Sequence, residues 1–260
     1  MSGILAHLVQ RIQDAADILK KSHRIAILTG AGISTPSGIP DFRSPDSGLW
    51  EQFDPLEVAS LATFRYQPDA FFHWLHPLAN KILKAVPNRA HLALADLQKF
   101  SQDVTVITQN IDGLHQKAGS THVLEVHGNL RTLTCVSCFD QVPSDSYLDT
   151  YLKNLSIPKC SKCHSILKPD VVLMGEQLPA RVWLQAQETS KHCDLMIVAG
   201  SSLEVLPVAG LPMRAIENGA HLIIINHSKT YIDVRADIVF HENVDEILPM
   251  IVQEVSRDEL

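Results

Sequence analysis

The sequence lacks a membrane-spanning segment and an excess of basic residues. None of its apolar stretches approaches the roughly 20 residues that cross a bilayer, and its 260 residues carry a formal net charge of −7. The first absence argues against a membrane protein, and the acidic balance disfavours a nucleic-acid binder. We therefore expect no membrane partner and no direct nucleic-acid partner, but an affinity for cationic, lysine-bearing partners.

An apolar secretory leader is also missing, because Arg11, Asp14 and Asp17 occupy the N-terminal segment. The last four residues, Arg257 to Leu260, are similar to an ER-retrieval signal. Without an entry signal we interpret this similarity as coincidental. The sequence thus predicts a cytoplasmic protein.

Cysteine is scarce, and the odd count of five does not favour a disulfide framework. Four of the five form two C-x-x-C pairs with 21 residues between them: Cys135, Cys138, Cys160 and Cys163. Each pair directs two thiolates at one metal, and four soft ligands complete a tetrahedron with no open position for water. The spacing predicts one structural zinc ion, with two reduced, unligated pairs as the alternative. Cys193 is expected to be buried and inert.

A glycine is missing from what otherwise looks like a dinucleotide-binding fingerprint. Gly30 and Gly32 follow the apolar run 25–28, where backbone N–H groups could face a pyrophosphate, but Thr35 occupies the third glycine position. No strand ending in a ribose-binding acid follows at the usual distance. A hydride-transferring dehydrogenase is therefore disfavoured.

Apolar runs alternate with amphipathic stretches along most of the chain, which predicts an α/β fold with a Rossmann-like, doubly wound parallel sheet. Continuous apolar runs indicate strands buried on both faces. The expected strands are 25–28, 104–108, 123–126, 171–174, 195–199, 222–225 and 238–240, and the expected helices are 4–19, 88–100, 179–190, 207–218 and 244–255.

Two insertions interrupt this alternation and predict a smaller domain. Residues 45–87 form an aromatic-rich helical module, after which Asn88 caps the next helix, and residues 130–168 hold the zinc ribbon. The larger, Rossmann-like domain then comprises residues 1–44, 88–129 and 169–260. A cleft between the two domains is the expected ligand site.

The motifs GAGIS (30–34), GIPDFRS (38–44), TQNIDGLH (108–115), VHG (126–128), the paired C-x-x-C and GSSL (200–203) occur in this order. The ordered set spans nearly the whole chain and resembles the sirtuins, NAD-dependent protein deacylases, in their bacterial or archaeal single-core form. The resemblance implies that NAD is consumed. The acyl oxygen of an acyl-lysine attacks C1′ of the nicotinamide ribose, nicotinamide leaves, and the acyl group ends on ADP-ribose.

The resemblance also implies individual roles. His127 would act as general base, since an imidazole titrates near neutrality, and Asn110 would organise the ribose or a bridging water. Asp112 and the backbone of Ile111 would hold the nicotinamide carboxamide, although an Asp before Gly is also a common turn residue. Gln109 would bond the ribose hydroxyls. His115 is expected to be structural.

Other residues are implied to bind the cofactor through mobile loops and the carboxyl edge of the sheet. Phe42 would screen the reactive ribose from returning nicotinamide, and Arg43 would pair with phosphate. The remaining candidates are Gly30, Ala31, Gly32, Ser34, Thr35, Asp41, Gly200, Ser201, Ser202, Asn226 and, at adenine, Val244.

The substrate peptide should add as a strand between Gly175-Glu176 and a segment that contains Leu203 and Val205. Many sirtuins have aromatic residues where Leu173 and Met174 stand, so the acyl-lysine tunnel is expected to be more pliable or to accept longer acyl groups.

Acyl groups that carry a carboxylate are expected to be poor substrates. Sirtuins that remove them have a Tyr-x-x-Arg pair, and the corresponding helix here reads Phe72-His73-Trp74-Leu75, so a carboxylate would be desolvated without a partner.

The leading hypothesis is an NAD-dependent lysine deacetylase acting on acetyl-lysine-bearing proteins or peptides. Long-chain deacylation and mono-ADP-ribosyl transfer on the same fold are the alternatives within the enzyme class. A zinc-ribbon DNA-binding or scaffold protein is disfavoured, because no basic run surrounds residues 135–163.

Overall fold

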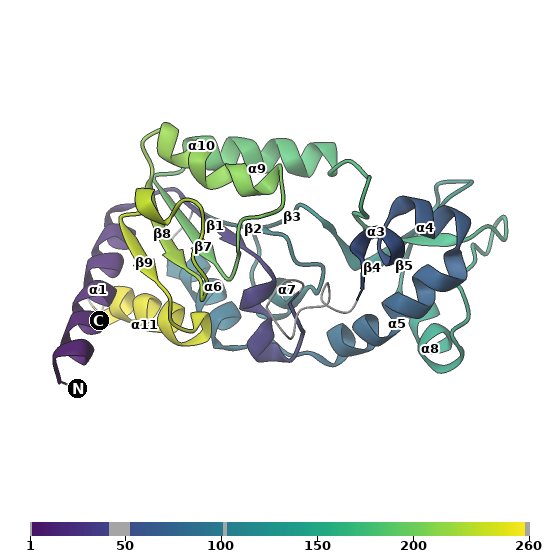
Figure 1. Ribbon diagram of the computed structural model, residues 1–260, viewed down its shortest axis with the longest axis horizontal. Helices are drawn as coiled ribbons and strands as arrows, with labels where there is room; N and C mark the ends of the chain where they lie inside the picture. Colours follow the sequence, from purple (N-terminus) through teal and green to yellow (C-terminus); the bar gives the residue numbers. More distant parts are fainter. Residues whose placement is uncertain (1, 42–52, 101–102, 258–260) are drawn as a thin grey trace.

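The computed structural model describes residues 2–41, 53–100 and 103–257. Its larger sheet has six parallel strands in the order β3-β2-β1-β7-β8-β9 (Figure 1). The chain winds outward from β1 to β3 on one side, and from β7 to β9 on the other, which confirms the doubly wound fold. The strands are β1 (Ile25–Thr29), β2 (Val104–Thr108), β3 (Val123–Glu125), β7 (Leu195–Ala199), β8 (His221–Ile225) and β9 (Ile238–Phe240).

Helices cover both faces of this sheet (Figure 1). Successive residues of a strand face opposite ways, so Ile25 and Ile27 join one core cluster, whereas Ala26 and Leu28 join the other. Every residue of β1 is buried, as its continuous apolar run predicts. The first face carries α1 (Ser2–Lys21), α6 (Arg89–Phe100) and α11 (Val244–Ser256), and the second carries α9 (Ala180–His192) and α10 (Leu211–Glu217).

The start of α6 follows the expected signal, whereas another expected helix is divided. The side chain of Asn88 accepts a hydrogen bond from the backbone N–H of Ala90 at 3.0 Å, so the predicted cap of α6 is confirmed. The stretch expected as one helix from 207 to 218 is divided into a 3-10 turn, η3 (Val208–Gly210), and α10. Within the described ranges, no helix is both long and apolar enough to cross a membrane.

A second, antiparallel sheet forms the centre of the smaller region, in the order β5-β4-β6. Figure 1 shows its strands beside the helices of the first insertion, away from the larger sheet. Aromatic and aliphatic residues of these helices make a separate core. The elements are α3 (Pro55–Val58), α4 (Leu61–Tyr66), α5 (Pro68–Lys84), β4 (Gly128–Cys135), β5 (Gln141–Pro143), α8 (Asp145–Asn154) and β6 (Leu167–Val171).

The strand expected at 171–174 is wrong in its bounds. Strand β6 ends at Val171 and pairs with β4, not with the parallel sheet. The apolar character of the next residues has another cause, since Leu173 is buried in the core of the smaller region. The predicted boundary between residues 168 and 169 falls inside β6. The exact domain boundaries therefore stay a prediction.

Candidate functional site

A cleft of about 1250 Å³ lies at the carboxyl edge of the parallel sheet. It receives the loops that follow β1, β2, β7 and β8, together with α5 and the segment after β6. Strands β1 and β7 are the point at which the strand order reverses, where doubly wound folds bind their ligands. Small-molecule sites measure roughly 300–1,000 Å³, so this cleft has room for more than one ligand.

Every described residue expected to bind the cofactor or the peptide lines this cleft. Phe42 and Arg43 lie outside the described residues. The motifs, which are far apart in the sequence, therefore meet in one place. The individual roles stay predictions, and the local geometry shows what each group is able to do.

The glycines after β1 bring two loops into contact. A Cβ at Gly30 would lie 2.8 Å from the carbonyl oxygen of Gly200, and one at Gly32 would lie 2.9 Å from the same oxygen. The N–H of Gly32 donates to that oxygen at 2.9 Å, so this N–H is used inside the protein and does not face the cleft as expected. The incomplete fingerprint thus reflects close packing of the β1 and β7 loops.

Asp112 is buried, and the carboxylate is held from two sides. Ser34 Oγ donates to Oδ2 at 2.7 Å, and the N–H of Leu114 donates to Oδ1 at 2.8 Å. Burial raises the pKa of Asp112, and the bonds from Leu114 and Ser34 oppose the rise. The Leu114 bond is the turn interaction that an Asp before Gly often makes, so Asp112 both closes this turn and lines the cleft.

Asn110 connects the same groups. Its Nδ2 donates to the carbonyl of Gly30 at 3.0 Å and lies 3.1 Å from Ser34 Oγ. Gln109 makes a comparable connection to the β7 loop, because its Nε2 donates to Ser201 Oγ at 2.9 Å. The loops after β1, β2 and β7 are therefore fixed to one another by side-chain amides.

His127 lies where the chain passes from the larger sheet into β4. Its Nδ1 is 3.1 Å from the carbonyl oxygen of Gln109. A carbonyl oxygen only accepts, so Nδ1 carries the proton of the neutral ring and Nε2 is its basic nitrogen. The next residue, Gly128, has φ of 75°, and a Cβ there would collide with the carbonyl of Asp170. Only glycine fits after His127.

Two neutral histidines lie beneath the polar loops. His115 Nε2 is 2.9 Å from Thr29 Oγ1. The centroid of the His115 ring lies 4.9 Å from that of His91, with the two rings tilted by 59°, and His91 Nε2 is 3.5 Å from Ser34 Oγ. Burial lowers the pKa of His91 to about 4 and that of His115 to about 3. His91 was not predicted from the sequence. Its position in the first turn of the helix capped by Asn88 is the signal that could have placed it near the β1 loop.

One face of α5 forms an apolar wall of the cleft. Its contributors follow helical spacing: Phe71, Trp74, Leu75, Leu78 and Ile82. Of the four-residue segment expected here, Trp74 and Leu75 line the cleft. Phe72 instead packs against Tyr151 in the core of the smaller region, so of Phe72 and Leu75 only Leu75 lines the cleft. The correspondence of this segment with the Tyr-x-x-Arg pair stays a prediction. The wall carries no charged side chain among these residues.

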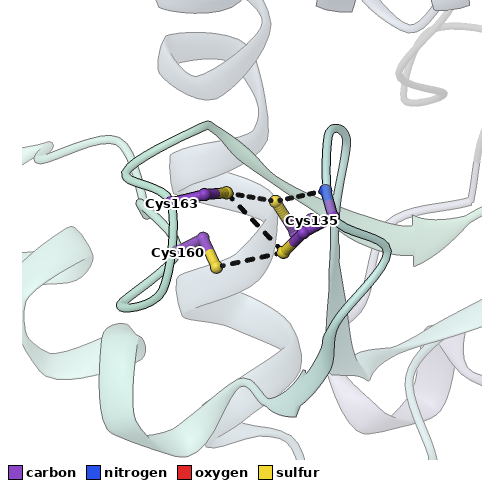
Figure 2. Close-up of side chains that lie close together, drawn as sticks. Cys135, Cys160 and Cys163 are labelled. Atoms are coloured by element: carbon purple, nitrogen blue, oxygen red, sulfur yellow. Dashed lines mark hydrogen bonds between the residues drawn. The ribbon is translucent and has the colours of Figure 1, made fainter.

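The four paired cysteines form a separate cluster. Their sulfur atoms all lie within 4.8 Å of one another, and Figure 2 shows the labelled side chains turned toward a common centre. The shortest separations are 3.3 Å for Cys135–Cys163, 3.6 Å for Cys138–Cys163 and 3.7 Å for Cys138–Cys160. A tetrahedral zinc with bonds of about 2.3 Å places its sulfurs about 3.8 Å apart, so the cluster fits zinc. None of the four lines the cleft, which is consistent with a structural metal.

The doubly wound sheet, the polar cleft at its carboxyl edge and the four-cysteine module define a nucleotide-binding type of enzyme core with an attached metal module. The chain belongs to the Sir2 family, whose model matches residues 30–207. It is 46% identical over 247 residues to NAD-dependent protein deacylase 2 of Archaeoglobus fulgidus, covering 95% of this chain and 96% of that one.

Solved structures agree with this membership. A Sir2 enzyme with a deacetylated p53 peptide and 3′-O-acetyl ADP-ribose superimposes with a TM-score of 0.87 at 37% identity, covering 94% of this chain and 98% of the other. The structure of Sir2Af2 bound to a myristoylated histone peptide gives a TM-score of 0.81 at 40% identity, covering 96% and 98%.

Proposed function

We propose that the protein is an NAD-dependent protein lysine deacetylase that transfers the acetyl group to ADP-ribose and releases nicotinamide. The observation that carries the proposal is the meeting of His127, Asn110, Asp112 and Ser201 in one cleft at the switch point of the sheet. The names of the relatives support the same activity.

The residues of the cleft fit NAD. Asp112 and the Ile111 backbone hold the carboxamide, since a buried carboxylate fixed by Ser34 is an oriented acceptor for an amide N–H. Gln109 and Ser201, already bonded to each other, would bind the ribose hydroxyls. When bound, NAD supplies an electrophilic ribose carbon and a leaving group that departs without protonation.

His127 takes a proton from a ribose hydroxyl. The Gln109 carbonyl fixes the tautomer by accepting from Nδ1, so Nε2 is the nitrogen that accepts the proton. Apolar side chains of α5 exclude water from the acyl group. The four cysteines would hold a structural zinc ion in the region of β4 and β6, away from the cleft, where it would take no part in the chemistry.

Neutral acyl groups are the proposed substrates. Leu75 and Leu78 lie one turn apart on the wall of the cleft, where a carboxylate would lose hydration without gaining a partner. The continuous apolar face from Phe71 to Ile82 also favours long-chain deacylation as a second candidate activity, and the myristoylated peptide bound to Sir2Af2 supports it. The cytoplasmic location stays a prediction.

The test is an incubation of the zinc-loaded protein with NAD and an acetyl-lysine peptide, or the matching myristoyl-lysine peptide. Nicotinamide release and peptide mass are followed together. We expect equal amounts of nicotinamide and free lysine peptide, and no turnover by His127→Ala. Nicotinamide release with a heavier, ADP-ribosylated peptide would favour mono-ADP-ribosyl transfer, and release of neither product would contradict the proposal.

A further inference from the structure

Lys168 and Glu176 form an ion pair behind one wall of the cleft. Lys168 Nζ lies 2.9 Å from Glu176 Oε2, and the two side chains are only 17% and 21% exposed. Lys168 belongs to β6, where it pairs with Thr134 of β4, and it does not itself line the cleft. Glu176 lies on the segment that does.

All three protons of the Lys168 ammonium have acceptors. Besides Glu176, Nζ donates to the carbonyl of Val171 at 2.8 Å and to that of Pro169 at 3.2 Å. The ammonium therefore connects the end of β6 to the segment that follows it. A half-buried lysine with three protein acceptors is oriented, unlike the solvated lysines that form most surface pairs.

Glu176 in turn closes a tight turn. Its Oε2 accepts from the N–H of Leu173 at 2.9 Å, while its own N–H donates to the carbonyl of Leu173 at 2.9 Å. Gly175 between them has φ of 87°, the conformation that the third residue of a type II turn requires. Oε2 of Glu176 thus accepts hydrogen bonds from both the Leu173 amide and the Lys168 ammonium.

The other edge of the segment is also anchored. The N–H of Val172 donates to the carbonyl of His127 at 2.9 Å, and the N–H of Met174 donates to the carbonyl of Ala59 at 2.9 Å. Residues 171–176 all line the cleft. The contacts of Val172 and Met174 join backbone groups, whereas Lys168 and Glu176 connect the segment to β6 through their side chains.

We propose that Lys168 and Glu176 are positioning residues that set the shape of the 171–176 wall for the acyl-lysine peptide. The inference rests on the proposed function, and it gives the Glu176 carboxylate a role within the protein, in addition to the backbone pairing with peptide that the sequence predicts for Gly175-Glu176. The pair acts on the peptide side of the cleft and leaves the loops after β1, β2 and β7 unchanged.

The experiment compares four zinc-loaded variants with the wild type. Lys168→Met removes the ammonium at similar length, Lys168→Arg restores a cation, and Glu176→Gln removes the charge but keeps the shape. Lys99→Met is the control, because it breaks a similar 2.8 Å pair with Asp96 on the exposed surface of α6. Steady-state KM is measured for peptide and for NAD, and hydrogen exchange is followed at the amide of Leu173.

Lys168→Met is expected to raise the KM for peptide about tenfold, since a lost hydrogen bond to a charged group has that order of effect. The KM for NAD should change less than about twofold. Hydrogen exchange at the Leu173 amide should accelerate in Lys168→Met. Glu176→Gln should show the rise in peptide KM and the faster exchange more weakly, and Lys168→Arg should return the peptide KM toward the wild-type value. Lys99→Met should match the wild type.

Unchanged exchange at Leu173 in Lys168→Met and Glu176→Gln would overturn the proposed brace. Faster exchange with an unchanged peptide KM, or equal rises in both KM values, would overturn its role in positioning peptide. Failure of the proposed function is distinguishable, because the wild type would then release no nicotinamide with acyl-lysine peptide, while the exchange measurement would still decide whether the brace exists.

Discussion

Acid should destabilise this protein through His91 and His115, which are buried and neutral. Their folded pKa values are about 4 and about 3, below the ordinary 6.5. As pH falls below 6.5 the unfolded chain takes up protons on both rings, whereas the folded protein takes them up only near pH 4 and pH 3. The unfolded state therefore binds more protons, and stability falls as pH is lowered through this window.

The size of the effect follows from these values. From pH 6.5 to pH 5 each ring contributes about 1.4 kcal/mol per pH unit, or about 2 kcal/mol, and the two together about 4 kcal/mol. Domains typically have about 5–15 kcal/mol of total stability. His91 and His115 alone should thus remove a large part of the stability by pH 5.

Urea unfolding at pH 7 and pH 5 measures this loss. In His115→Gln the decrease in the free energy of unfolding between the two pH values should be smaller than in the wild type by about 2 kcal/mol. His7→Gln, at an exposed position of α1, is the control and should lose as much as the wild type. Acid effects on other groups, including the cysteines, cancel in this comparison. Equal losses in His115→Gln and wild type would refute the reasoning.

Three further predictions concern the metal, the residue after the base, and the acyl wall. Cys163→Ser should lower bound zinc below one equivalent and reduce the melting temperature, measured by metal analysis and calorimetry; an unchanged zinc content would contradict the ligand assignment. Gly128→Ala should cost at least about 3 kcal/mol in urea unfolding, because the new Cβ meets backbone at positive φ, whereas Gly210→Ala, with open space around it, should stay within about 1 kcal/mol. Leu78→Glu should lower kcat/KM for a myristoyl-lysine peptide at least about tenfold by placing a charge on the wall. Leu92→Glu, at a position of α6 where the leucine side chain is exposed, should not lower it, and equal effects would argue against acyl contact with α5.

Features that depend on local pattern could be predicted from the sequence. The continuous apolar run before Gly30 required a strand buried on both faces, and Asn88 provided a side-chain acceptor where a helix starts. The spacing of the cysteine pairs predicted a common cluster, because each short C-x-x-C turn directs two thiols to one side and a single metal ion needs four of them. These features were confirmed in the structure.

Features that depend on distant partners could not be predicted in this way. The apolar residues after Val171 have the composition of a strand, but their neighbours belong to other elements and to the cleft. Which of Phe71 and Phe72 lines the cleft could not be predicted, since both are equally apolar and only packing against Tyr151 distinguishes Phe72. The ion pair of Lys168 and Glu176 could not be predicted, because one partner belongs to β6 and the other to the segment that follows it.

Product analysis decides whether one cleft brings NAD and an acyl-lysine together for acyl transfer. The wild-type protein is incubated with NAD and an acetyl-lysine peptide, and all products are quantified by mass spectrometry. We expect nicotinamide, deacetylated peptide and acetyl-ADP-ribose in equal amounts. Free acetate with unconsumed NAD, or NAD breakdown to ADP-ribose with the peptide still acetylated, would contradict it.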